Sequence, residues 1–336
     1  MAGLPVAKGF LATKVQRFDM SAHSFRHLFI AFVALGIVLS PVRDLRAARA
    51  YVIVDTQTGF VLDEQKSKEK LQVGSLTKVA MAMVVLDWAE KHSGDLNQVV
   101  ALPSEAFVGT GENLVGFQPG DKITLRDLLY AALVQSDNIA AYTLAAHVGA
   151  ALQPVVGGGS SESPVTVFVG QMNALARALR MQRTRFVNPH GIDSNERSLP
   201  YTTASDLARL ARYAINKAGF RFYVSQKERQ ISFTRGDKKM GYSLRNTNEL
   251  LGRDGIDGIK TGRTNRAGDC LILSAQRESH VSEANGRTTV IPRALIVVLL
   301  GSKDRFAEGL QLLGRGWELQ DQWVARGRPV DPKKTL

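Results

Sequence analysis

The 336-residue sequence predicts an α+β fold (α/β in the broad sense), in which one sheet is closed by remote segments of the chain and carries an inserted helical subdomain. Strand patterns occur near both ends of the chain after residue 50, whereas helical patterns fill most of the interval between them. The hydrophobic content of 44% is enough, at this length, for a substantial core in one large domain or two intimate subdomains.

The elements are expected in a fixed order along the chain. Tyr51–Asp55 and Phe60–Leu62, joined by a Thr-Gln-Thr-Gly turn, have the pattern of a hairpin. Helices are expected at 75–91, 124–134, 137–148, 164–180 and 203–217. Strands are expected at 230–235, 241–246, 256–261, 269–276 and 289–300, before a last helix at 303–318. Gly157–Ser161 is expected to be a flexible loop and Arg277–Thr288 a polar, hairpin-like excursion.

The first 50 residues have the features of an export signal. Basic residues precede twelve apolar residues, Leu28–Leu39, and Ala48-Arg49-Ala50 matches an A-x-A cleavage site. The apolar span is short for a membrane helix and a charged stretch follows it, so a cleaved signal peptide and a retained N-terminal anchor both stay open. A true start at Met20 instead of Met1 is also open. The predicted divisions are 1–50, the signal peptide or anchor; 51–320, the main domain; and 321–336, a short polar tail.

Composition narrows the class of function. Residues 1–50 carry seven Lys or Arg and two Asp, so the rest of the chain keeps +7 of the net charge of +12. This charge suits association with anionic polymers of the cell envelope, or only a solvated basic surface. No basic run is interleaved with aromatic residues, so nucleic acid is not an expected partner. The single cysteine, Cys270, lies in an apolar strand pattern and is expected to pack in the core. Six scattered histidines without a C-x-x-C or H-E-x-x-H pattern predict no metal site, and no cofactor is expected.

The first chemical motif is Ser75-Leu76-Thr77-Lys78. A serine hydroxyl is a poor nucleophile at neutral pH and needs a base, which can be a lysine kept deprotonated by desolvation. Residues i and i+3 share one helix face, and the following run Val79–Leu86 is apolar at every position, so burial would desolvate Lys78. A second S-x-x-K, Ser67–Lys70, lies in a charge-rich stretch and is interpreted as a solvated loop.

Two further motifs occur once each, downstream of the first. Ser136-Asp137-Asn138 follows a helical segment that opens with a capping pattern at Thr124, and a turn between two helices can present a hydroxyl and an amide into a cleft. Lys260-Thr261-Gly262 lies in a glycine-containing strand pattern that suits an edge strand lining a site. Each motif alone has a structural explanation as a cap, a turn or a strand end. Their order and co-occurrence favour serine acyl-transfer chemistry.

With these motifs, the chain resembles the serine-type D-alanyl-D-alanine carboxypeptidases, the low-molecular-weight penicillin-binding proteins. The resemblance extends over about residues 51–320, a penicillin-binding or DD-peptidase catalytic domain. It includes Val54–Gly59, Gly74–Lys78, Asn188–Gly191, Thr203–Ala208, Asp257–Thr264 with Ala267-Gly268, and Leu300-Gly301 with Arg305-Phe306. It implies a β-lactamase/transpeptidase-like fold, with a mostly antiparallel sheet packed between helices and the cleft where the helical part meets the edge strand.

The resemblance also implies roles for residues. Ser75 would form an acyl-enzyme with the penultimate D-alanine, Lys78 would activate it, and Ser136 would relay protons toward the departing D-alanine. Asn138 would hold the substrate amide and the lysine. Lys260 would add positive potential and a hydrogen bond to Ser136.

The remaining implied roles concern the substrate. Thr261 and Arg305 would bind the substrate's terminal carboxylate. The N–H groups of Ser75 and of Arg263, which follows Gly262, would form the oxyanion hole. The family often has an aromatic residue or histidine where this chain has Arg263. His190 is expected to be structural.

The expected activity is the removal of the terminal D-alanine from peptidoglycan stem peptides, with β-lactams as acylating inhibitors. The expected location is the periplasm or cell envelope, with inner-membrane association through the N-terminal segment. A β-lactamase is an alternative. Class A β-lactamases use a glutamate between the second and third motifs to activate the deacylating water. Glu196 could supply that glutamate, but Pro200 stands where the class A loop carries asparagine. A DD-endopeptidase of the same fold and a non-catalytic protein that binds peptidoglycan or β-lactams also stay open.

Overall fold

The computed structural model describes residues 48–156, 162–193, 199–284 and 287–336. The chain divides into two compact units, Met1–Asp44 and Leu45–Leu336, and the described residues belong to the second. The predicted signal or anchor therefore lies almost wholly outside the described residues, and so do the predicted loop at 157–161 and Glu196. Among the described helices, none combines the length and apolar character that crossing a membrane requires.

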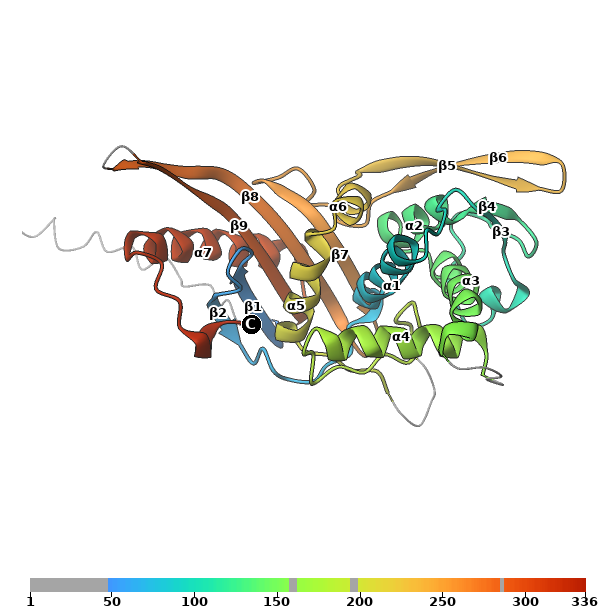
Figure 1. The fold of residues 1–336 in the computed structure, drawn as a ribbon, viewed down its shortest axis with the longest axis horizontal. Helices are drawn as coiled ribbons and strands as arrows, with labels where there is room; N and C mark the ends of the chain where they lie inside the picture. Colours follow the sequence, from blue (N-terminus) through green and yellow to red (C-terminus); the bar gives the residue numbers. More distant parts are fainter. Residues whose placement is uncertain (1–47, 157–161, 194–198, 285–286) are drawn as a thin grey trace, which may run out of the picture. The chain divides into compact units, whose positions relative to one another are not determined.

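The main sheet has five antiparallel strands in the order β2-β1-β9-β8-β7. These are β1 (Ala50–Asp55), β2 (Val61–Gln65), β7 (Ile256–Thr264), β8 (Gly268–Ala284) and β9 (Arg287–Ser302). β1 pairs along its length with β9, from Ala50 opposite Leu300 to Asp55 opposite Leu295. The prediction of a sheet closed by remote segments is therefore confirmed, and β7 is its edge strand (Figure 1).

The two faces of this sheet bury different side chains, because successive residues of a strand point to opposite sides. On one face, Val52 and Val54 join the larger core with α5 (Ala204–Ile215). On the other face, Ile53 packs in a second core with α7 (Arg305–Ala325), whose Trp317 is almost completely buried. The sheet thus lies between helices, as the resemblance implied.

The inserted helical part lies at the β7 edge of the sheet (Figure 1). It comprises α1 (Lys78–Lys91), α2 (Leu125–Val134), α3 (Asn138–Val156), α4 (Pro164–Ala178) and the short α6 (Ala218–Val224). Residues 78–85 of α1 are all buried, which confirms the buried helix predicted from the apolar run. α2 begins as predicted, with the Thr124 hydroxyl accepting a hydrogen bond from the Asp127 N–H.

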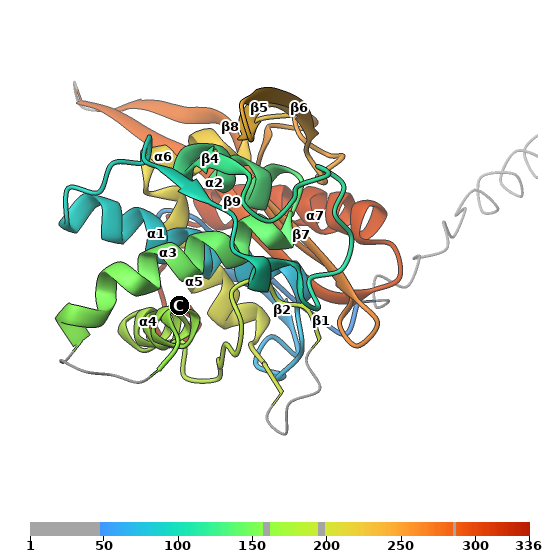
Figure 2. The same cartoon turned by 90° about the vertical axis from the view of Figure 1, so that its right-hand side faces the viewer.

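The prediction of one sheet is wrong. The strands predicted at 230–235 and 241–246 belong to a separate four-stranded sheet in the order β3-β4-β5-β6, beside α2 (Figures 1 and 2). Its strands are β3 (Val99–Ala101), β4 (Lys122–Thr124), β5 (Glu228–Arg235) and β6 (Lys238–Arg245). β3 and β4 have three residues each, too few for an alternating pattern to reveal them.

Three short 3-10 turns complete the fold: η1 (Gly74–Thr77), η2 (Ser104–Phe107) and η3 (Pro332–Lys334). Residues 321–336, predicted as a polar tail, contain the end of α7 and η3. Here Trp323 stacks on Phe60 at 4.8 Å between ring centroids, and the Leu336 N–H donates to the Gly59 carbonyl. The C-terminus is thereby held against the first hairpin.

Three further predictions concern residues 277–288, Cys270 and Ser67. The polar excursion at 277–288 continues β8 and β9 as a long antiparallel hairpin, with Arg277 paired to Arg293 and Ala284 to Arg287. Cys270 is fully buried in β8, as predicted. The interpretation of Ser67 as solvated is wrong, because its side chain is buried and its hydroxyl donates to Glu64.

Candidate active site

The S-x-x-K motif lies where the 3-10 turn η1 meets α1. Ser75 is in the turn and Lys78 is the first residue of the α-helix, so the α-helix begins three residues later than predicted. Ser75 is half-buried, whereas Lys78 is completely buried among the apolar residues of α1. The sequence therefore positions a hydroxyl at the surface of the site and an amine inside it.

The side-chain nitrogen of Lys78 lies within hydrogen-bonding distance of three oxygen atoms. Its Nζ lies 2.9 Å from Ser75 Oγ, 2.6 Å from Asn138 Oδ1 and 2.9 Å from the carbonyl oxygen of His190. A neutral lysine has two N–H groups and one lone pair, and the two carbonyl oxygens can only accept hydrogen bonds. With both N–H groups donated to those oxygens, the lone pair faces the Ser75 hydroxyl. The arrangement is that of a general base beside a nucleophile.

Burial favours the neutral form of this lysine. It lowers the pKa of Lys78 from 10.5 to about 7, against the opposing effect of the nearby Asp137 carboxylate. Lys260 is also fully buried, and burial together with the charges of Lys78 and Arg305 holds its pKa well below the ordinary value. Two buried amines next to each other cannot both carry charge without a large cost in free energy.

We expect the rate of acylation by a penicillin to rise with pH and then level off above about pH 7. Only the deprotonated form of Lys78 can accept the Ser75 proton, and its pKa is lowered to about 7. Titration of His190 would not explain this profile, because burial and the charge of Lys78 lower the pKa of His190 to about 3. Stopped-flow measurement of acylation from pH 5.5 to 9 checks this, and a flat profile would contradict the role of Lys78.

The second motif forms the turn between α2 and α3. Ser136 has a φ of 68°, in the left-handed region, and Asp137 caps α3 by accepting the Ala140 N–H at 2.7 Å. Burial raises the pKa of Asp137. The Asn138 Nδ2 donates to the Thr110 carbonyl at 2.8 Å, which turns Oδ1 toward Lys78. The prediction of a polar turn between two helices is confirmed.

The third motif brings the edge strand β7 against η1. A Cβ atom on Gly262 would lie 2.4 Å from the Val73 carbonyl oxygen, so only glycine permits this approach. A Cβ on Gly74 would lie 3.1 Å from the Arg263 nitrogen, which places the Arg263 amide beside the turn that carries Ser75. The two N–H groups that the resemblance assigns to the oxyanion hole thus belong to adjacent backbones.

A fourth segment, Asn188–Gly191, closes the site from another direction. A Cβ atom on Gly191 would lie only 2.0 Å from the Gly74 carbonyl oxygen. Gly191 has a φ of 85°, which also requires glycine. The turn is held by Asn188, whose Oδ1 accepts the Gly191 N–H at 2.6 Å. This turn carries the His190 carbonyl to Lys78.

The side chains of β7 make partly different contacts from those expected. The Lys260 Nζ donates to the Thr261 carbonyl at 3.1 Å, and the expected hydrogen bond from Lys260 to Ser136 is not among those formed by the described residues. The Thr261 hydroxyl donates to the Thr247 hydroxyl at 2.7 Å. Arg305, the first residue of α7, lies against β7 and donates to the Gly262 carbonyl at 3.2 Å.

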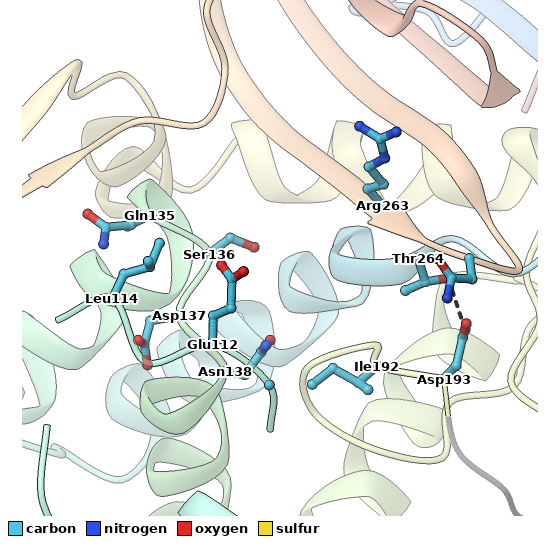
Figure 3. A pocket seen from close by; sticks show the side chains of 12 residues that line it. Glu112, Leu114, Gln135, Ser136, Asp137, Asn138, Ile192, Asp193, Arg263 and Thr264 are labelled. Atoms are coloured by element: carbon cyan, nitrogen blue, oxygen red, sulfur yellow. Dashed lines mark hydrogen bonds between the residues drawn. The ribbon is translucent and has the colours of Figure 1, made fainter. Parts of the chain in front are cut away.

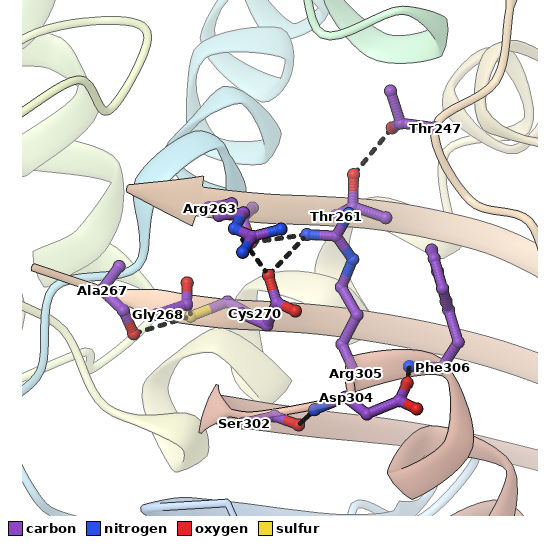
Figure 4. Close-up of polar contacts among 12 residues, drawn as sticks. Thr247, Thr261, Arg263, Ala267, Gly268, Cys270, Ser302, Asp304, Arg305 and Phe306 are labelled. Carbon is purple, nitrogen blue, oxygen red and sulfur yellow. Dashed lines mark hydrogen bonds and ion pairs between the residues drawn. The ribbon is translucent and has the colours of Figure 1, made fainter. Parts of the chain in front are cut away.

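Arg263 and Arg305 converge on one carboxylate (Figure 4). The Asp269 Oδ1 lies 3.2 Å from Arg305 Nη1 and 3.4 Å from Arg263 Nε. Asp269 stands opposite Arg263 in the pairing of β7 with β8. The Arg263 side chain is 75% exposed, so the pair holds this arginine at the mouth of the site.

These elements border a cavity of about 670 Å³. Of the predicted site residues, Ser136, Asn138 and Arg263 line it, and Arg263 and Thr264 from β7 lie across from the Ser136 turn (Figure 3). The other lining residues are Gly111, Glu112, Leu114, Gln135, Asp137, Ile192, Asp193, Thr264 and Asn265. Asp193, two residues after Gly191, accepts a hydrogen bond from the Thr264 hydroxyl at 2.9 Å and so ties its segment to β7.

Four residues with clear roles were missed. Asp137 caps the helix that begins at Asn138, and the Thr110 carbonyl orients the Asn138 amide. Thr247 contacts Thr261, and Asp269 pairs with Arg263 and Arg305. Asp137 stands inside its motif and could have been singled out. Nothing in the sequence places Thr110, Thr247 or Asp269 near the motifs, because each contact depends on the tertiary packing.

Several known proteins are similar to this chain in sequence. The sequence profile of the D-alanyl-D-alanine carboxypeptidase family, Peptidase S11, matches residues 39–283. The D-alanyl-D-alanine carboxypeptidase DacC of Escherichia coli is 31% identical over 326 residues, covering 94% of this chain and 71% of the relative. A D-alanyl-D-alanine endopeptidase of Pseudomonas aeruginosa is 31% identical over 285 residues, covering 82% of this chain and 79% of the relative.

Among solved structures, the Streptomyces K15 DD-transpeptidase superimposes with a TM-score of 0.68 at 26% identity, over 81% of this chain and 97% of that protein. The fold is thus shared with a DD-transpeptidase. This chain spans only part of some curated carboxypeptidases: the match covers 64% of one relative and 54% of another.

Proposed function

Because this chain belongs to the D-alanyl-D-alanine carboxypeptidase family, Peptidase S11, we propose that it removes the terminal D-alanine from peptidoglycan stem peptides through an acyl-enzyme on Ser75. Members of this family are serine-type peptidases. One observation carries the proposal: the buried Nζ of Lys78 lies 2.9 Å from Ser75 Oγ, with its pKa lowered to about 7.

In the proposed acylation, the Ser75 Oγ attacks the carbonyl carbon of the penultimate D-alanine. The hydroxyl proton passes to Lys78 Nζ, and the developing oxyanion accepts hydrogen bonds from the N–H groups of Ser75 and Arg263. The approach of Gly74 to the Arg263 nitrogen supports this assignment. The C–N bond then breaks, and the proton on Lys78 is returned to the leaving amine by way of Ser136. Water afterwards hydrolyses the ester by the same route in reverse.

The terminal carboxylate of the substrate requires cations and hydrogen-bond donors. We assign it to the side of the site formed by Thr261, Lys260 and Arg305. The contact of Arg305 with the Gly262 carbonyl and the pairing of Thr261 with Thr247 support this assignment, since both groups are held beside β7. Asn138 is assigned the substrate amide in addition to its contact with Lys78.

The same chemistry accounts for inhibition by β-lactams. The Ser75 Oγ would attack the β-lactam carbonyl carbon and the ring C–N bond would break. The nitrogen would stay tethered to the acyl group through the rest of the opened ring, so the leaving group could not diffuse away. We propose that such adducts leave slowly. We also propose that the protein acts in the periplasm or cell envelope, where its substrate is, and that residues 1–50 export it or anchor it at the inner membrane.

A DD-endopeptidase is the second candidate, because the endopeptidase of Pseudomonas aeruginosa is as similar in sequence as the carboxypeptidase DacC. Both reactions share the acylation step and differ in the size of the leaving group. We expect release of D-alanine from a pentapeptide ending in D-Ala-D-Ala to exceed cleavage of a cross-linked dimer by about tenfold in kcat/KM. Chromatography of the products from both substrates, with the purified full chain, measures this ratio.

The contrary outcomes each point to a different activity. Faster cleavage of the dimer would establish the endopeptidase. Rapid turnover of penicillin without release of D-alanine would indicate a β-lactamase, and binding without any Ser75-dependent reaction would indicate a binding protein.

A further inference from the structure

A second, strongly basic hollow lies outside the active-site cavity. Its volume is about 820 Å³, and four cationic side chains line it: Lys68, Arg180, Arg183 and Arg209, here called the basic groove. It shares no lining residue with the 670 Å³ cavity beside Ser136. Nothing in the proposed peptidase reaction uses these residues.

The basic groove carries more positive than negative charge, because four cationic side chains line it against two carboxylates, those of Asp206 and Leu336. None of its four cations forms an ion pair within the described part of the chain. Asp206, the acidic side chain that lines the hollow, is buried and accepts hydrogen bonds from the Arg183 N–H and the Thr184 hydroxyl. The carboxylate end of the chain, Leu336, also lines it. Four cations around one hollow repel one another, and a bound anion would relieve that repulsion.

The floor of the groove contains an unused hydrogen-bonding group. Ser205, in the first turn of α5, is 7% exposed, and its hydroxyl has no hydrogen-bond partner among the described residues. The hydroxyl lines the hollow, where a ligand oxygen could accept its hydrogen bond. Its backbone N–H donates to the Ser67 carbonyl at 3.0 Å, which fixes the loop that carries Lys68.

The groove continues in both directions. A hollow of about 280 Å³ shares Lys68, Ser205 and Arg209 with it and adds Lys333 and Lys334. Two acidic residues also line this hollow, but Asp63 is paired with Arg315 and Glu64 accepts the Ser67 hydroxyl. On the other side, a hollow of about 550 Å³ shares Arg180 and adds Arg177. Cations therefore repeat along a series of connected depressions, which fits a linear molecule with repeated anionic groups better than a single small anion.

We propose that the basic groove binds the free carboxylates of a second stem peptide on the same peptidoglycan strand, while another stem occupies the active-site cavity. This inference rests on the proposed function, since that substrate is a polymer with carboxylates on every stem. Charged side chains that line hollows suit peptide carboxylates, whereas a lipid surface would call for cations on a projecting face.

The connection to the active site is short. Lys68 is seven positions before Ser75, and between them Leu71 pairs with Thr202, next to the start of α5. One segment therefore forms a wall of the groove and then enters the turn that carries the nucleophile. A strand held in the groove would remain close to this enzyme between cleavage events, which raises the local substrate concentration.

The test compares two double variants in a Ser75→Ala background, so that turnover does not obscure binding. Lys68→Glu/Arg180→Glu reverses two exposed charges, each of which lines two of the three hollows. Lys238→Glu/Lys239→Glu changes the net charge equally at two exposed residues that line none of these hollows. Binding to purified peptidoglycan sacculi, freed of attached phosphate polymers, is measured by co-sedimentation at low and moderate salt.

We expect the groove variant to bind sacculi about tenfold more weakly than the control variant at low salt, with the difference shrinking as salt is raised. Sacculi whose carboxylates have been amidated should bind both variants equally weakly. With Ser75 restored, both double variants should release D-alanine from the soluble pentapeptide at the unmodified rate. Arg209→Gln serves as a second groove variant if the first loses that activity.

Three results would overturn the inference: equal binding of the two variants to sacculi, undiminished binding to amidated sacculi, or a loss confined to vesicles of anionic phospholipid. The last would assign the groove to a membrane. A failure of the proposed function would be seen separately, as an absence of pentapeptide turnover by the unmodified chain. The binding comparison does not depend on that turnover.

Discussion

Replacement of Ser75 by alanine is expected to reduce D-alanine release from a D-Ala-D-Ala pentapeptide by at least about 10⁴-fold. Without the hydroxyl, no acyl-enzyme can form, and the remaining donors can only polarise the carbonyl. The fold should be retained, because Ser75 is half-buried and its hydroxyl is hydrogen-bonded only to Lys78 among the described residues. Released D-alanine, measured with an enzyme-coupled assay, gives the rate, and thermal unfolding checks the fold.

The chain supplies a matched control in its second S-x-x-K serine. Ser67→Ala removes a hydroxyl that donates to Glu64, and it should lower stability by about 1 kcal/mol without changing the rate by more than about twofold. If Ser67→Ala were as damaging as Ser75→Ala, the assignment of the nucleophile would be wrong.

Replacement of Lys78 by methionine, which has a similar length but no amine, should lower kcat/KM for acylation by about 10²–10⁴-fold. The Ser75 hydroxyl would keep its place but lose the base that accepts its proton. The carbonyl oxygens of Asn138 and His190 would also lose their N–H donors, at a cost of about 1–3 kcal/mol each, partly offset by the removal of a buried amine. Penicillin acylation rates and thermal unfolding separate these two effects.

Lys78→Arg distinguishes a base from a positive charge. Arginine keeps the charge but stays protonated at every accessible pH. We therefore expect this variant to be as slow as Lys78→Met from pH 6 to 9. Substantial activity in Lys78→Arg would mean that the lysine acts by electrostatic attraction and that another group takes the proton.

Much of the fold could be predicted because local patterns were strong. The apolar run that follows Lys78 is uninterrupted, so it had to be buried, and Thr124 caps its helix at the change from polar to apolar residues. The pairing of β1 with β9 was predictable in outline, since two apolar strand patterns at opposite ends of a chain need partners.

The second sheet was not predictable on this basis. Its strands β3 and β4 have three residues each, and the pairing of β4 with β5 joins residues more than a hundred positions apart. The end of α7 was also misjudged, because Trp323 gains its burial from Phe60 and from the C-terminal segment and not from neighbours in its own helix.

In the site as well, some contacts could be predicted from the sequence and others could not. The motifs predicted Ser75, Lys78 and Asn138, and the structure places the Lys78 Nζ within hydrogen-bonding distance of the other two side chains. Contacts through the backbone could not be foreseen: the His190 carbonyl reaches Lys78 only because Gly191 packs against Gly74. Likewise, Lys260 turns to the Thr261 carbonyl instead of Ser136, a choice of rotamer that sequence does not encode.

The proposed chemistry depends on one step, in which deprotonated Lys78 activates Ser75 for attack on an acyl donor. Intact-mass spectrometry of the full chain after mixing with a penicillin, followed by peptide mapping of the adduct, examines that step. We expect a single adduct on Ser75, formed more slowly below pH 7 than above it. An adduct on any other residue, or no covalent adduct at any pH, would show that Ser75 and Lys78 do not act in this way.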